Sequence, residues 1–167
     1  MSEDPAIYNA APAAYPVFKY VGFDPGKTGA ICELEVRTRQ PTPWRVPTVK
    51  YRNTKELDVL TLSAYIDEVK ADAIFILEDP GGHAPSAKGL ASMRDCFSTL
   101  NTLLIDHRCT YHRFHAKQWQ SEFWTRPKMP KGQSFDTKAA ARRAAQCIWP
   151  NMDWTPTPRA QKEDHNF

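Results

Sequence analysis

Apolar residues recur along the chain with two different periods, and these periods predict where strands and helices lie. Residues 17–23, VFKYVGF, and residues 29–37 each predict a strand, with a Pro-Gly turn between them. Residues 73–78, AIFILE, are continuously apolar before their final acid, which is typical of a central strand that is buried on both faces. Residues 109–115, CTYHRFH, predict one more strand.

Helical spacing of apolar side chains predicts three helices between and after these strands. The first is expected to begin at Asn53, because Asn53 and Glu56 have capping-box spacing and leucines follow at helical intervals. Residues 87–106 predict the second helix. Residues 136–148 form an alanine-rich segment that predicts the third, with Asp136 as its N-cap.

Proline-rich and polar segments connect these elements. The segment RQPTPWRVP is expected to break the second strand, and VPTVKYR predicts a third strand at a sheet edge. Residues 127–135 predict a basic loop. A strand hairpin followed by alternating helices and strands predicts an α/β domain with a mixed sheet. We expect residues 17–167 to form this single domain and residues 1–16, rich in Ala and Pro, to form a flexible N-terminal arm.

The distribution of charged residues along the chain is more informative than the net charge. The chain has 22 basic and 19 acidic residues among 167, so composition alone does not indicate a nucleic-acid-binding protein. Basic residues dominate between Arg108 and Arg143, however. The aromatic residues Tyr111, Phe114, Trp119, Phe123 and Trp124 are interleaved with them. This combination favours a nucleic-acid-binding face, although a run of charge is more commonly a solvated surface.

Cysteine spacing and hydropathy exclude several classes of protein. The four cysteines are far apart and form no C-x-x-C pair, so a zinc site of ordinary spacing is not expected and buried free thiols are. No apolar run is long enough to predict a membrane span. The N-terminus lacks the basic start and apolar block of a secretion signal, and we therefore expect a cytoplasmic protein of a bacterial or phage-infected cell.

The segment VGFDPGKTGAI, residues 21–31, contains the Gly-Lys-Thr that ends a phosphate-binding P-loop. A P-loop would need its first glycine at position 21, which is Val, and Pro25 would remove one of the backbone N–H groups that such a loop uses. A strand pattern follows where a P-loop opens a helix. The segment is better interpreted as a strand hairpin with Asp24 at its tip.

Two carboxylates follow apolar strand patterns and precede Pro-Gly turns, in FDPG and LEDPGG. If their strands are neighbours, Asp24 and Glu78 lie side by side at one sheet edge, where a cation would have to offset their repulsion. Mg²⁺ fits, because it prefers oxygen ligands and keeps waters for a phosphate substrate. Either acid alone reads more simply as a loop cap, but the pair favours a metal site.

These motifs resemble the RuvC-type Holliday junction resolvases of the RNase H-like superfamily, most closely their bacteriophage branch. The resemblance covers about residues 18–167. It rests on VGFDPGKTGAI, on AIFILED, and on SAKGLASMR at the start of a helix, where Ser86, Leu90 and Arg94 match. Ala91 and Asp95 replace glycines that are typical of the family in that helix. HAKQWQSEFW, before the alanine-rich helix, is also similar to the phage branch.

The resemblance implies an RNase H-like mixed sheet flanked by helices, in a homodimeric, Mg²⁺-dependent endonuclease (with Mn²⁺ as a substitute) that cuts four-way DNA junctions in recombination and repair. Asp24 and Glu78 would bind the metal, and an activated water would attack phosphorus. His83 and Lys88, after Glu78, would lie near the scissile phosphate. The DNA contacts expected are Lys27, His83, Lys88, Arg94, Lys117, Lys128, Lys131, Lys138 and Arg142.

The family ends its catalytic set with carboxylates on a last helix, and here the sequence reaches only KEDHNF. Asp164, with His165 beside it, is expected to supply the third ligand, or the last helix is missing and the site is incomplete. Asp164 could equally be an exposed terminal acid. A missing carboxylate would leave a protein that binds junctions without cutting them.

Two other classes compete with the nuclease. An ATPase of the actin and sugar-kinase type also uses an Asp-x-Gly hairpin, but 167 residues are too few for its two lobes and its second phosphate loop is absent. A non-catalytic protein that binds branched DNA remains open. The sequence does not separate four-way junctions from flaps or forks as the substrate.

Overall fold

The computed structural model describes residues 17–81, 87–125, 127–130, 132 and 135–152. The chain divides into two compact units, Met1–Ala116 and Lys117–Phe167, and each is described by itself. The predicted arm over residues 1–16 lies outside the described residues.

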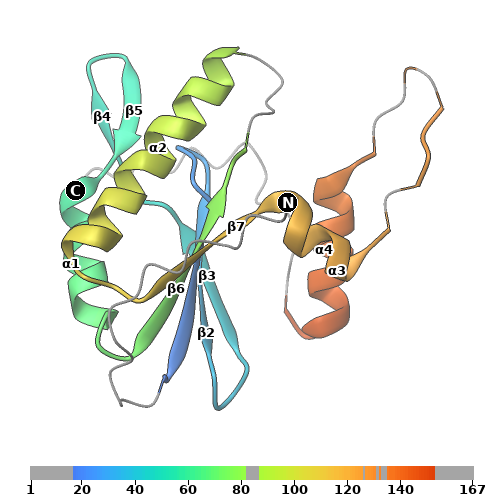
Figure 1. The fold of residues 1–167 in the computed structure, drawn as a ribbon, viewed down its shortest axis with the longest axis horizontal. Helices are drawn as coiled ribbons and strands as arrows, with labels where there is room; N and C mark the ends of the chain where they lie inside the picture. The colour runs from blue at the N-terminus through green and yellow to red at the C-terminus, as the bar shows by residue number, and fades with distance from the viewer. Residues whose placement is uncertain (1–16, 82–86, 126, 131, 133–134, 153–167) are drawn as a thin grey trace, which may run out of the picture. The chain divides into compact units, whose positions relative to one another are not determined.

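The first unit is built on a mixed five-stranded sheet, as predicted (Figure 1). Its order is β3-β2-β1-β6-β7, with β1 antiparallel to β2 and parallel to β6. The strand predicted as central, β6, lies between β1 and β7 and is parallel to both. The bounds are β1 Lys19–Phe23, β2 Ala30–Glu35, β3 Pro41–Arg45, β6 Ala73–Asp79 and β7 Tyr111–His115.

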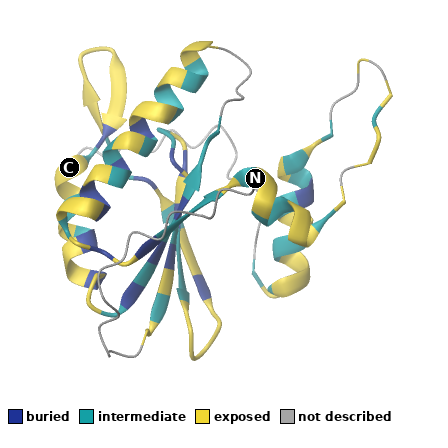
Figure 2. Cartoon of the chain, viewed as in Figure 1, coloured by how far each residue is buried: buried dark blue, intermediate teal, exposed yellow. Residues whose placement is uncertain are grey.

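Helices α1, Val59–Val69, and α2, Ala87–Asp106, lie side by side and pack on the same core (Figure 1). Alternate residues of β1 and β6 enter this core, because side chains alternate between the faces of a strand. Phe23 and Phe75 stack there with ring centroids 5.9 Å apart. The core also contains Val21, Ile31, Leu62, Ile66, Leu77, Leu100 and Leu104, all buried (Figure 2).

The proline-rich segment that was expected to break the second strand forms a strand of its own. Pro41 and Pro43 both lie in β3, opposite Leu34 and Cys32 of β2. The prediction was wrong because β3 is an edge strand with β2 as its neighbour in the sheet. At an edge, every second residue directs its N–H away from the sheet, and a proline there removes no ladder hydrogen bond.

The segment after β3 also differs from the prediction. Strand β4, Thr48–Tyr51, does not join the main sheet but pairs with β5, Thr54–Leu57, in a separate two-stranded hairpin. The helix predicted to begin at Asn53 begins after Asp58, whose carboxylate accepts a hydrogen bond from the backbone N–H of Thr61. Asn53 lies in the hairpin turn, so the Asn53–Glu56 spacing was misread as a capping box.

The described part of the second unit contains helix α4 and all of α3 except its first residue, Ala116. Helix α4, Thr137–Ile148, has Asp136 as its N-cap, as predicted, with a 2.9 Å hydrogen bond from the backbone N–H of Ala139. Helix α3, Ala116–Phe123, was not predicted, because its short and mostly polar sequence lacks a clear apolar stripe. The described residues of the segment 127–135 form no helix or strand, as expected of a loop.

The remaining predictions about the whole chain concern thiols and membranes. All four cysteines are free, and burial raises the pKa of Cys109 to about 12. Cys96 is also buried, whereas Cys147 is exposed, so the expectation of buried thiols holds for only part of the set. Within the described part of the chain, no helix combines the length and the apolar character that crossing a bilayer requires.

Candidate functional site

The turn after β1 places Asp24 at the end of its strand. The backbone N–H of Asp24 donates to the carbonyl of Ala30, and the N–H of Gly29 donates to the carbonyl of Gly26, each at 2.9 Å. A Cβ atom at position 29 would overlap the Asp24 carbonyl oxygen, so this turn requires glycine. The chain leaves the turn as β2 rather than as a helix, which excludes a P-loop.

The register of β1 and β6 brings the two predicted carboxylates together. Phe23 pairs with Leu77 in parallel, so Asp24 and Glu78 are the next residues of two adjacent strands, which are about 4.8 Å apart. Phe23 and Leu77 enter the core, and the residue after each projects toward the opposite face. Asp24 is exposed and Glu78 is half-buried, so both side chains reach solvent at this edge.

Two further ionisable residues lie beside this pair, and neither was predicted from the sequence. Asp79 follows Glu78, and its carboxylate accepts a hydrogen bond from the backbone N–H of Gly81 at 2.9 Å. The Nδ1 atom of His115, at the end of β7, is 3.7 Å from an Asp79 oxygen. The second acid of LEDPGG was the available signal for Asp79. The pairing of Asp79 with His115 depends on the β6–β7 register, and no sequence pattern near either residue predicts it.

The third ligand expected from the sequence falls outside the described residues, as both Asp164 and His165 do. Among the described residues, no group of three or more His, Cys, Asp or Glu side chains is arranged to hold a metal ion. Two adjacent carboxylates nevertheless suit Mg²⁺, which commonly uses one or two protein carboxylates and completes its shell with waters and substrate phosphates.

The residues predicted to contact DNA lie in three described parts of the chain and at two positions outside the described residues. Lys27 lies in the turn after Asp24, near enough to α2 to lower the pKa of Cys96 against the larger effect of burial. Lys88 and Arg94 are exposed on α2. Lys117, Lys128, Lys138 and Arg142 are exposed in the second unit and are described within that unit alone. His83 and Lys131 lie outside the described residues.

Aromatic residues of the second unit pack mainly on one another. The ring of Trp119 meets Trp124 and Phe123 edge-on, with centroids 5.6 and 6.4 Å apart. Trp119 is thus at the centre of a small aromatic cluster within this unit. Trp124 also lines a hollow of about 420 Å³ together with Lys117, Gln120, Ser121 and Thr125.

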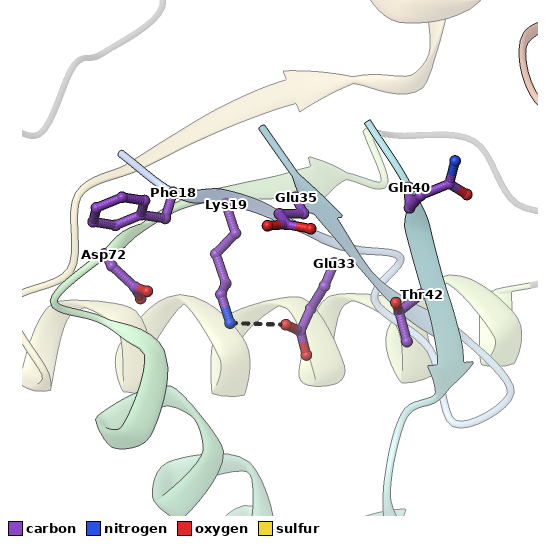
Figure 3. Close-up of a pocket in the computed structure, with 7 residues that line it drawn as sticks. All are labelled: Phe18, Lys19, Glu33, Glu35, Gln40, Thr42 and Asp72. Atoms are coloured by element: carbon purple, nitrogen blue, oxygen red, sulfur yellow. Dashed lines mark hydrogen bonds and ion pairs between the residues drawn. The ribbon is translucent and has the colours of Figure 1, made fainter. Parts of the chain in front are cut away.

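A second hollow, of about 350 Å³, lies at the other end of β1 from Asp24 (Figure 3). Lys19 and Glu33 form a 3.1 Å ion pair inside it, and Glu35 and Asp72 also line it. The hollow contains no residue of the Asp24–Glu78 pair. It is a separate polar feature and no part of the candidate site.

The sequence matches no protein family model and no curated protein. Its fold, however, is that of known structures. Thermus thermophilus RuvC in complex with a Holliday junction substrate aligns with a TM-score of 0.55 at 13% identity, over 85% of each chain. A second T. thermophilus RuvC structure aligns with a TM-score of 0.54, also at 13% identity, over 84% of this chain and 85% of that one. The predicted RNase H-like, RuvC-like fold is confirmed.

Proposed function

We propose that the chain is a Mg²⁺-dependent, structure-selective DNA endonuclease that resolves four-way junctions by phosphodiester hydrolysis. The observation that carries the proposal is the register of β1 and β6, which makes Asp24 and Glu78 neighbours at the carboxyl ends of two parallel strands. Support comes from the shared fold with T. thermophilus RuvC, one of whose structures contains a Holliday junction substrate.

In this proposal Asp24 and Glu78 hold the metal, with Asp164 and His165 as further ligands and Mn²⁺ as a substitute. Bound Mg²⁺ would supply a Lewis acid for a phosphoryl oxygen and lower the pKa of a bound water. A water oxygen would bond to phosphorus as one P–O bond of the phosphodiester breaks. The water would lose a proton, and the leaving oxygen would take up a proton to end as a hydroxyl group. The chain's own carboxylates fix where this happens, because the β1–β6 ladder and the Gly29 turn hold them.

The predicted cations would hold the DNA backbone. Phosphate contacts carry little sequence information, which suits an enzyme that recognises a branched shape. Lys27 is adjacent in sequence to the Asp24 turn, and Lys88 lies in the first turn of α2. We assign Lys27, Lys88 and His83 to phosphates near the cut. The junction arms would be held by Arg94, Lys117, Lys128, Lys131, Lys138 and Arg142.

We expect the nuclease to act as a homodimer. A four-way junction is resolved by cutting two opposed strands, so one Asp24–Glu78 pair per chain serves one cut. Light scattering of the free chain and of its junction complex will measure the stoichiometry. Two chains per junction are expected, and one chain per junction would contradict the paired-cut proposal.

The decisive experiment is cleavage of a labelled four-way junction in Mg²⁺, beside a linear duplex of the same sequence. Paired nicks in the junction alone are expected from the wild-type chain. Asp24→Asn and Glu78→Gln should each lower the cleavage rate about 1,000-fold, corresponding to about 4 kcal/mol of lost transition-state stabilisation, while junction binding persists.

Glu35→Gln is the matched control, because Glu35 is an acid at the end of β2 away from Asp24, and it should cut at the wild-type rate. Wild-type activity in Asp24→Asn would overturn the assignment of the site. Preferential cutting of flaps or forks would replace the junction as the substrate.

A non-catalytic branched-DNA-binding protein is the second candidate. It stays a candidate because Asp164, the third ligand expected from the sequence, lies outside the described residues, which contain no metal-binding group of three or more ligands. Such a protein would bind the junction tightly without cutting it, and Asp24→Asn would leave its affinity unchanged.

A further inference from the structure

The β4–β5 hairpin was not anticipated from the sequence, and it lies at the same end of the sheet as Asp24 (Figure 1). Two backbone hydrogen bonds hold its base there. Val46 donates to the carbonyl of Gly29, in the Asp24 turn, and Asp58 donates to the carbonyl of Pro47. Val46 and Leu57 are buried in the core, so the hairpin starts from a rigid support beside the candidate site.

Beyond this base the hairpin is exposed along both strands (Figure 2). It carries three cations, Lys50, Arg52 and Lys55, and one carboxylate, Glu56. The carboxylate accepts a hydrogen bond from the hydroxyl of Thr54. None of the three cations has an ion pair with another residue of the described chain.

Two of these cations face one another across the hairpin. Lys50 and Lys55 are direct partners in the antiparallel register, so their side chains emerge on the same face. Like charges in directly opposite positions destabilise a pair of strands. A bound anion between the two ammonium groups would remove that repulsion.

The third cation occupies a strained position at the tip. Arg52 has a φ of 52°, in the left-handed region that favours glycine at this place in a two-residue hairpin turn. Its guanidinium lies over the ring of Tyr51, 5.3 Å from the centroid, which holds the charge at the tip. Arg52 thus places a charged side chain at a position where glycine would be less strained.

We propose that the β4–β5 hairpin is a DNA-binding arm that holds the phosphate backbone of a duplex next to the strand that is cut. Lys50 and Lys55 clamp phosphates on one face, and Arg52 contacts a phosphate beyond the tip. The proposal rests on the nuclease proposal, because it takes the partner to be the same DNA that reaches Asp24 and Glu78.

The test is the salt dependence of binding, measured with the full-length chain and a fluorescent four-way junction in the absence of divalent metal. Each phosphate contact adds about 0.9 to the slope of log K against log salt concentration, so Lys50→Gln with Lys55→Gln should reduce that slope by about 2. Lys50→Arg with Lys55→Arg should retain the wild-type slope. Arg52→Gly should reduce the slope by about 1 while its Tm stays equal to, or above, that of the wild-type chain.

The control removes two cations at the other end of the sheet, with Arg37→Gln and Lys70→Gln, and should keep the wild-type slope. If the wild-type chain binds and cuts the junction while the Lys50–Lys55 double variant keeps the wild-type slope, the hairpin proposal is overturned and the nuclease proposal stands. An equal reduction of the slope in the control variant also overturns the hairpin proposal, because such a reduction would depend on net charge alone. If the wild-type chain does not bind the junction, both proposals fail.

Discussion

At the scale of single residues, the position of Asp24 depends on a glycine five residues later. Gly29 lies against the backbone of Asp24 and Gly26, and a side chain there would overlap the Asp24 carbonyl oxygen. The sequence shows two glycines in DPGKTG but not which of them is sterically required. That distinction needs the folded turn, because the conflict is with a backbone atom across it.

Gly29→Ala should therefore both destabilise the chain and displace Asp24. Forcing a methyl group into this contact should cost roughly 2–3 kcal/mol, which lowers Tm by about 5–10 °C for a chain of this size. Junction cleavage should fall further than the loss of folded protein explains. Thermal unfolding and cleavage at 20 °C will measure the two effects.

Gly26→Ala is the matched control for this change. Its Cβ would meet the nearest atom at 3.7 Å, an ordinary contact, so both Tm and cleavage should stay close to wild type. Equal damage from both substitutions would show that the turn needs glycine flexibility in general rather than the close approach at Gly29.

At the scale of elements, the start of α1 shows where prediction from sequence succeeds and where it fails. Helix α4 was located correctly because Asp136 directly precedes an alanine-rich segment with no competing structure. The start of α1 was placed too early because TKEL, residues 54–57, suits a helix by propensity, yet pairs with β4 as a strand. The cross-strand partner decides this, and the local sequence does not contain it.

The N-cap of α1 gives a prediction with a defined pH range. Hydrogen bonds from the Thr61 hydroxyl and backbone hold the pKa of Asp58 below its usual value of 3.8. A lowered folded-state pKa means that this stabilisation is present above pH 3.8 and is lost as the pH falls through the lower folded-state value. At pH 7, Asp58→Ala should cost about 1 kcal/mol.

The measurement is chemical unfolding of the wild-type chain, Asp58→Ala and Asp58→Asn between pH 2.5 and 7. The difference between wild type and Asp58→Ala should narrow below pH 3.8, as Asp58 is protonated. Asn is also a good N-cap but does not titrate, so Asp58→Asn should be nearly as stable as wild type at pH 7. The difference in free energy of unfolding between Asp58→Asn and Asp58→Ala should therefore stay constant below pH 3.8. A difference that is constant with pH would contradict the role of the carboxylate.

A half-buried hydrogen bond links α1 to His107, the residue that follows α2. The hydroxyl of Ser63 and the Nε2 atom of His107 are 2.8 Å apart, and the other ring nitrogen of His107 lies 3.4 Å from Asp67. This Ser-His-Asp arrangement joins α1 to the residue at the end of α2, with Asp67 at the surface. Its geometry explains how the C-terminal end of α2 is held, and Ser63→Ala should lower stability by about 1 kcal/mol.

At the scale of the whole molecule, the fold and the pairing of Asp24 with Glu78 were predictable because each depends on a strong local pattern. An apolar strand that ends in an acid before Pro-Gly occurs twice, and the parallel register then sets the two ends together. Helix α3, the β4–β5 hairpin and the Asp79–His115 contact were not predictable. Each depends on pairing or packing between segments that carry no distinctive sequence of their own.

The basic residues of the second unit allow a test of whether both units contribute to junction binding. Lys138 and Arg142 are four residues apart on α4, which places them on one face of the helix, and both are exposed. Replacing both by Gln should reduce the salt slope of junction binding by about 2 without changing Tm. When this double variant is combined with the Lys50–Lys55 double variant, the two reductions in salt slope should add, because the two pairs of residues lie in different units.

Strand β3 has a consequence for how copies of this protein can meet. The outer edge of a sheet normally offers unpaired N–H groups that a strand of a second molecule can use to extend the ladder. Pro41 and Pro43 have no N–H to offer, so this edge is closed to added strands and to the fibrous aggregation that follows from them. If two copies assemble on one DNA junction, they do so without a continuous sheet across β3.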